Sequence, residues 1–119
     1  MFSTRAIIAV IVAGIAGTIA NSFAITALAG AAVLPLIFSL GRNLVAIIVA
    51  FLLPLIYARM TGFTAHIVSF LALTIIPSIL AKTVFAAAAP WGIVLGVNAV
   101  YAVVAIIVYV LIVRAPATR

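Results

Sequence analysis

Apolar residues form four long runs that take up almost the whole chain. The runs cover about residues 6–29, 33–57, 63–86 and 91–113. The hydrocarbon core of a bilayer is about 30 Å thick, so a spanning helix needs about 20 apolar residues. Backbone amides in lipid must bond within their own segment, and the runs lack the alternation of a barrel strand. The sequence therefore predicts an all-α polytopic protein with four transmembrane helices, forming a single membrane domain over residues 1–119.

The scarcity of charge supports the same fold class. Charged residues make up 5% of the chain and hydrophobic residues 71%, whereas about a quarter of a soluble protein is charged. The six Lys and Arg residues have no Asp or Glu beside them. They are too scattered to form a nucleic-acid surface, so we expect no nucleic acid partner. Anionic lipid headgroups, which attract cations just outside a span, are the expected partners.

The cations also predict an orientation. If the chain crosses the membrane four times, Arg5, Arg59, Arg114 and Arg119 fall on one side, and the connections on the other side carry no charge. Lys and Arg are enriched in cytoplasmic loops. We therefore predict that both termini are cytoplasmic and that the protein lies in a bacterial inner membrane.

A sequence pattern in the second run recurs in the fourth. Leu-Gly-x-Asn-x-Val occurs at residues 40–45 and again at 95–100, and Ala-Ala-x-x-Pro precedes both copies. We interpret the chain as two tandem, duplicated helical hairpins over about residues 5–59 and 60–114. Chance matching in a chain rich in Ala, Val and Ile is the alternative.

Two cations fall away from the cytoplasmic ends. If the second helix begins at Val33, Arg42 lies about 13 Å along it, where an Arg costs about 2.5–3.5 kcal/mol. Alternatively, Arg42 reaches the headgroups, or residues 34–40 lie in the interface and the spanning helix begins near Gly41. The functional interpretation is a positive cavity, binding an anion or a lipid headgroup, formed by Arg42, Lys82, Asn43 and Asn98.

Small residues predict where helices approach one another. Ala9, Ala13 and Gly17 share a face of the first helix, and Gly92 and Gly96 form a GxxxG pattern in the fourth. Packing within the bundle is one interpretation, and contact with a second copy or another protein is the other. Polar residues further along the first helix, beginning at Asn21 and Ser22, are expected to hold helices together by hydrogen bonds.

His66 follows Gly62 by four residues, a spacing that occurs where antenna helices ligate bacteriochlorophyll. One such match leaves two interpretations open, a pigment or haem ligand and a histidine that is interfacial or hydrogen-bonded. No metal cluster and no cofactor are predicted, since the chain has no Cys, Asp or Glu.

Catalysis is not expected, because no nucleophile–base pair and no paired carboxylates occur. We predict a non-catalytic subunit or scaffold that packs against membrane-protein partners, or against itself, and against anionic lipids. The alternative is a small channel or carrier for an anionic or neutral solute that uses the cavity of Arg42, Lys82, Asn43 and Asn98.

Overall fold

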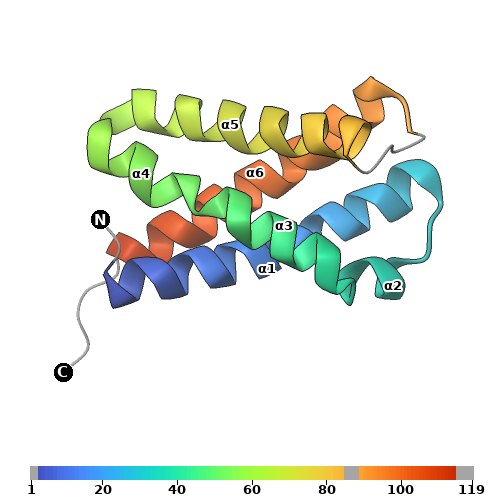
Figure 1. Cartoon of the computed structure of the whole chain (residues 1–119), viewed down its shortest axis with the longest axis horizontal. Helices are drawn as coiled ribbons and strands as arrows, with labels where there is room; N and C mark the ends of the chain where they lie inside the picture. Colours follow the sequence, from blue (N-terminus) through green and yellow to red (C-terminus); the bar gives the residue numbers. More distant parts are fainter. Residues whose placement is uncertain (1–2, 85–88, 115–119) are drawn as a thin grey trace.

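The computed structural model describes residues 3–84 and 89–114, and every regular element in them is a helix. The predicted end of the third helix at residue 86, the repeat positions 86 and 87, and Arg119 lie outside the described residues. The elements are α1 (Thr4–Ala29), α2 (Val33–Ile37), α3 (Leu40–Ala50), α4 (Leu52–Arg59), α5 (Gly62–Thr83) and α6 (Trp91–Arg114), shown in Figure 1.

Four helical stretches are long and apolar enough to cross a membrane. They are Thr4–Ala29, Leu40–Arg59, Gly62–Thr83 and Trp91–Arg114, with mean hydropathies of 2.0, 2.0, 1.9 and 2.5. The prediction of an all-α protein with four such helices is confirmed. The composition of these helices indicates an integral membrane protein.

The second predicted helix, 33–57, is not continuous. It is interrupted after Ile37, and α3 begins at Leu40 because Ser39 caps it: the Ser39 hydroxyl accepts a hydrogen bond from the backbone N–H of Arg42 at 3.3 Å. The short α2 thus lies outside the spanning stretch. The prediction of one helix from Val33 is wrong, and the alternative start near Gly41 is close to the observed one.

A second interruption separates α3 from α4 at Phe51. Pro54 follows three residues later, and a proline has no N–H and its ring conflicts with the carbonyl four residues earlier, here that of Ala50. Pro77 lies inside α5, which remains one helix.

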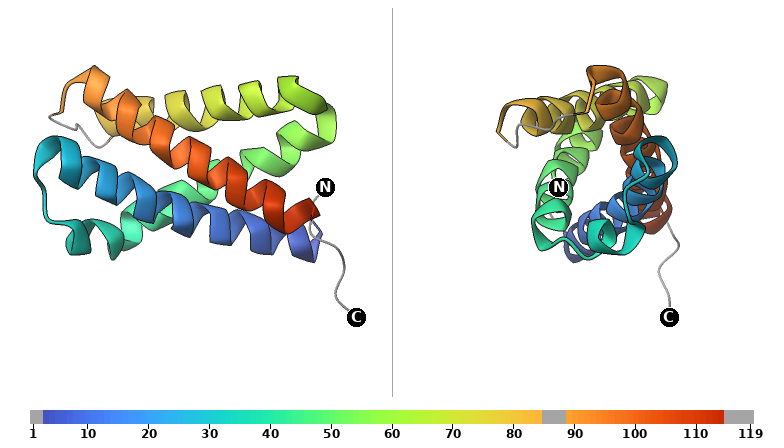
Figure 2. Two further views of the ribbon diagram at one scale, coloured as in Figure 1. Left: turned by 180° about the vertical axis from the view of Figure 1, so that it is seen from behind. Right: turned by 90° about the vertical axis from the view of Figure 1, so that its right-hand side faces the viewer.

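The spanning stretches pack side by side, and small residues set their spacing. The most extensive contact is between α1 and α6; α5 also packs on α6, and α3 packs on α1. Seen from behind in Figure 2, α6 runs obliquely across α1 and α5. A Cβ added to Gly14 would lie 2.6 Å from Cγ1 of Ile47, and one added to Gly17 would lie 2.7 Å from Cε1 of Tyr101. At these two glycines the backbone of α1 touches its neighbours directly.

The main helix contact joins the two predicted hairpins, since α1 belongs to the first and α6 to the second. The hairpins are therefore not separate packing units. Their origin by duplication stays a prediction. The ends of the helices alternate, so that the start of α1 and the ends of α4 and α6 lie at the same end of the bundle (Figure 1, left).

Candidate functional site: a cavity around Arg42

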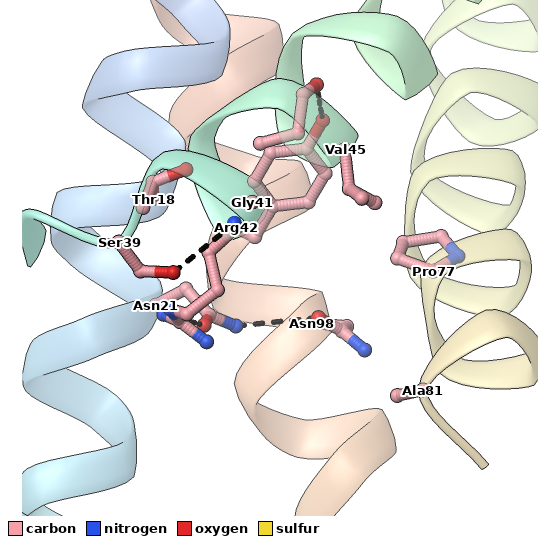
Figure 3. Close-up of a pocket in the computed structure, with 11 residues that line it drawn as sticks. Thr18, Asn21, Ser39, Gly41, Arg42, Val45, Pro77, Ala81 and Asn98 are labelled. Carbon is pink, nitrogen blue, oxygen red and sulfur yellow. Dashed lines mark hydrogen bonds between the residues drawn. The ribbon is translucent and has the colours of Figure 1, made fainter. Parts of the chain in front are cut away.

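A cavity lies between the four spanning stretches, toward the end of the bundle where α3 begins. Its volume is about 360 Å³, and Figure 3 shows it with its lining side chains. The lining residues come from α1, α3 and its cap, α5 and α6. They are Thr18, Asn21, Ser39, Gly41, Arg42, Val45, Ala46, Pro77, Ala81, Asn98 and Tyr101.

Arg42 is the one charged residue of this lining within residues 3–84 and 89–114, and three hydrogen bonds fix its guanidinium. Nε donates to the carbonyl of Leu36 at 3.1 Å. Nη2 donates to Oδ1 of Asn21 at 2.8 Å and to the hydroxyl of Ser22 at 2.9 Å. The guanidinium thus holds the last turn of α2 against α1, and its Nε–Nη2 edge is fully used.

Arg42 also determines which group donates and which accepts in a chain of side-chain hydrogen bonds that crosses the bundle. Because a guanidinium only donates, Asn21 presents its oxygen to Arg42 and its Nδ2 to α6. That Nδ2 donates to the carbonyl of Val97 at 2.8 Å and to Oδ1 of Asn98 at 3.2 Å. Nδ2 of Asn98 in turn donates to the hydroxyl of Ser78 at 2.9 Å. One consistent network therefore joins α3, α1, α6 and α5.

All of these partners are neutral, so the network satisfies the donors of Arg42 without cancelling its charge. The chain contains no Asp or Glu that could do so. Among the residues that the structure describes, Nη1 of Arg42 makes no hydrogen bond. The cavity thus has a half-buried positive charge with an unused pair of N–H groups.

A second unused polar group belongs to the same cavity. Thr18 lines it and is 2% exposed, and its Oγ1 has no hydrogen-bond partner among the described residues. The carbonyl of Thr18, by contrast, accepts from the hydroxyl of Ser22 at 2.6 Å. Buried polar side chains are normally satisfied, so the Thr18 hydroxyl is an unsatisfied donor buried in the wall of the cavity.

Tyr101 closes the cavity toward the middle of the bundle. Its buried hydroxyl donates to the carbonyl of Ala46 at 2.5 Å and so ties α6 to α3. Beyond it the helices meet in a packed core that includes Ala50, Leu53 and Ala105, each 0% exposed. The cavity is therefore a one-sided pocket and not a continuous channel.

A smaller cavity of about 260 Å³ lies at the opposite end of the bundle. Its lining comes from the end of α4, the start of α5 and the end of α6, and consists of Tyr57, Met60, Thr61, Gly62, Tyr109, Val110, Val113 and Arg114. The core beyond Tyr101 separates the two cavities.

Of the four residues predicted to form a positive cavity, the structure brings Arg42 and Asn98 together and places the other two elsewhere. Asn43 donates to the carbonyls of Ile37 and Ser39, both at 2.9 Å, and thereby fixes the turn between α2 and α3. The amine of Lys82 donates to the carbonyl of Ala89 at 2.7 Å. Neither side chain lines the cavity.

The two sets of small residues lie in different environments. Ala9 and Ala13 are 0% exposed and Gly17 is buried against α6, all within the bundle. Gly92 and Gly96 lie on the outer side of α6, where an added Cβ would meet no atom of the described residues within 4 Å.

His66 lies away from the cavity, at the end where α4 and α5 meet. Its Nδ1 shares a 2.6 Å hydrogen bond with the hydroxyl of Tyr57. Tyr57 also stacks on Tyr109, with ring centroids 5.7 Å apart. This is the geometry of a hydrogen-bonded histidine, and only Nε2 would be open to a ligand.

The sequence did not predict that Thr18, Asn21 and Tyr101 line the cavity or that Ser22 binds Arg42. The available signal was their polarity within apolar runs, together with the spacing of Thr18 and Ser22, which puts them one turn apart on α1.

Comparison with models of protein families, with curated proteins and with solved structures found no match.

Proposed function

We propose that this protein is a small integral membrane carrier that binds an anion in the cavity around Arg42. The observation that carries the proposal is the guanidinium itself. It stands on the wall of a cavity between apolar helices, with neutral partners and with Nη1 unused among the described residues. A charge in a medium of low dielectric is stabilised by an opposite charge close by. Because the chain has no Asp or Glu side chain, that charge comes from a bound anion.

The division of the bundle into two cavities supports a carrier over an open channel. A carrier exposes its site to one side at a time, with a packed region closing the other side. Tyr101 and the core below it form such a region, between the cavity of Arg42 and the smaller cavity beside Arg114. With the cationic helix ends in the cytoplasm, the Arg42 cavity would open toward the outer face of a bacterial inner membrane.

The proposal is tested by anion flux into vesicles that contain the purified protein. Wild-type vesicles are expected to take up chloride, nitrate or acetate faster than protein-free vesicles. Arg42→Gln should abolish this uptake, because it removes the charge and keeps an amide N–H near the position of Nε, where it can donate to the carbonyl of Leu36.

Arg59→Gln provides the matched control. It makes the same chemical change at an exposed position in the last turn of α4, away from the cavity. Its uptake should equal that of the wild type. Vesicles that remain silent to every anion tested, or equal loss in both variants, would rule the proposal out.

A second candidate function is a subunit of a larger membrane assembly, and the outward placement of Gly92 and Gly96 favours it. Small residues let helix backbones approach closely, so an unoccupied pair suits a helix of another chain. The natural chain has no Cys, so single-cysteine variants at these positions give clean cross-linking in native membranes. A product between chains supports the assembly, and its absence at both positions argues against it.

A further inference from the structure

From the donors and the shape of the Arg42 cavity, we infer that its ligand is a small monocarboxylate with a short apolar chain. This inference rests on the proposed function and narrows it from anions in general to one chemical class. Four features of the cavity carry it: its size, its single charge, the donors that remain unused, and the apolar part of its wall.

The single charge limits the ligand to one negative charge. Among the described residues, Arg42 is the only charged residue of the lining, so a monoanion cancels its charge. A dianion would leave one negative charge without a partner in surroundings of low dielectric, which is strongly unfavourable. The volume of about 360 Å³ lies near the lower end of the roughly 300–1,000 Å³ of small-molecule pockets.

The single charge favours a carboxylate over a phosphate, because a phosphate group carries about −1.5 to −2 at pH 7. Carboxylates and phosphates alike are frequently bound by an edge of the guanidinium that offers two parallel N–H groups. In Arg42 the Nε–Nη2 edge is occupied by Leu36, Asn21 and Ser22, and the other edge has lost its Nη2 donors to the same partners. Nη1 is left as a donor to one oxygen, and the unpartnered hydroxyl of Thr18, buried in the wall, can donate to a second oxygen once its side chain turns into the cavity.

The opposite part of the wall is hydrocarbon. Pro77 and Ala81 of α5 lie across the cavity from Arg42 in Figure 3, and Val45 and Ala46 of α3 extend the apolar surface. A ligand that is anionic at one end and apolar at the other matches this division. Burying each methylene of such a chain strengthens binding by about fourfold.

The test is calorimetric titration of the protein, reconstituted in phosphatidylcholine bilayers, with acetate, propionate, butyrate, pentanoate and hexanoate. Affinity should rise about fourfold per methylene and then fall once the cavity is full. Chloride and inorganic phosphate serve as the comparison anions. If they bind as tightly as butyrate, or if chain length has no effect, the inference is overturned while the proposed function stands. If no anion binds at all, both fail.

Two variants leave the Arg42 network intact and locate the ligand in the cavity. Thr18→Val, which is nearly isosteric, should lower the affinity for the carboxylates by about tenfold because it removes one hydrogen bond to a charged group. Its effect on the affinity for chloride should be much smaller.

Ala81→Leu should abolish the binding of hexanoate and leave the binding of acetate unchanged. Ala58→Leu, an exposed site on α4, is the matched control and should change nothing; equal effects of the two leucines would overturn the assignment.

Anionic lipid is the other source of a monovalent anion with an apolar tail. The titration is therefore repeated in bilayers that contain phosphatidylglycerol. Unchanged butyrate affinity supports a free carboxylate. Loss of butyrate binding in these bilayers would show that a lipid headgroup occupies the site, and would overturn the inference.

Discussion

The N–H donors of Arg42 are largely satisfied by hydrogen bonds, whereas no opposite charge among the residues that the structure describes balances its positive charge. Hydrogen bonds to a charged group contribute about 1.5–3 kcal/mol each, and Arg42 makes three, to Leu36, Asn21 and Ser22. These bonds explain why the side chain turns into the bundle and does not extend along α3 to the headgroups. They also leave its electrostatic field in place, because each partner is an amide, a hydroxyl or a carbonyl.

At Gly17 the backbone of α1 meets the ring of Tyr101, the residue that closes the cavity. Gly17→Ala would place a methyl group 2.7 Å from Cε1 of that ring. We expect it to destabilise the protein by about 1–3 kcal/mol, as overpacking does, and to disturb the hydrogen bond of Tyr101 to Ala46. Thermal unfolding in detergent measures the effect.

Gly96→Ala is the control for this prediction, because an added Cβ there meets no described atom within 4 Å. Replacing a mid-helix glycine by alanine should stabilise the protein by about 0.5–1 kcal/mol. Unfolding temperatures that fall equally in both variants would contradict the close contact at Gly17.

At the scale of single elements, the break between α2 and α3 positions the site. Ser39 caps α3 through the backbone N–H of Arg42, and Asn43 fixes the preceding turn. A continuous helix from Val33 would place Arg42 mid-helix, with the carbonyl of Leu36 engaged in the helix ladder. At the break that carbonyl accepts a long 3.5 Å bond from the backbone N–H of Ser39, and it also accepts from Nε of Arg42 at 3.1 Å.

Removal of the cap should therefore affect both stability and the site. Ser39→Ala is expected to cost about 0.5–2 kcal/mol and to weaken anion binding, since the first turn of α3 carries Arg42. Ser3→Ala removes the equivalent cap of α1, where the hydroxyl accepts from the N–H of Ala6 at 3.1 Å. It should cost a similar amount and leave anion binding unchanged. Titration and unfolding of both variants test this pair of expectations, and equal loss of binding in both would contradict it.

The long apolar runs predicted the ends of three of the four spanning helices to within about two residues, wherever the structure describes those ends. The break at residues 38 and 39 was not predictable in the same way. Its cause is one serine whose hydroxyl competes for a backbone amide, and a serine within an apolar run is equally compatible with an unbroken helix. The outward face of Gly92 and Gly96 escaped prediction for a similar reason, because glycine spacing does not say which neighbour is present.

At the scale of the whole molecule, the arginines at the helix ends and the Arg42 cavity lie toward opposite ends of the bundle. Arg5, Arg59 and Arg114 belong to helix ends that lie together, and the Arg42 cavity lies toward the other end. The sequence predicted this division from the positions of the cations alone. It did not predict which polar residues share the cavity. That depends on which face each helix turns toward its neighbours, and the most extensive contact joins α1 and α6, which are far apart in sequence.

The orientation has its own test, which uses the absence of Cys from the natural chain. Met60→Cys and Ala32→Cys place single thiols at exposed positions in the connections at opposite ends of the bundle. In intact cells a membrane-impermeant maleimide should label Ala32→Cys and should reach Met60→Cys only after lysis. The reverse pattern would invert the orientation, and labelling of both in intact cells would contradict a four-span topology.

The central claim is that Arg42 lacks a counter-charge within the chain and takes an anion in its place. Asn21→Asp tests it directly, because it puts a carboxylate oxygen where Oδ1 of Asn21 now lies, 2.8 Å from Nη2, at the cost of the bonds that Nδ2 donates to Val97 and Asn98. A ligand that binds the folded protein stabilises it by an amount that grows with the logarithm of its concentration once this exceeds the Kd, so the measurement is thermal unfolding across a series of butyrate concentrations. The wild type should become more stable as butyrate increases, and Asn21→Asp should unfold cooperatively at a temperature that butyrate no longer changes. An equal rise in both proteins would contradict the claim.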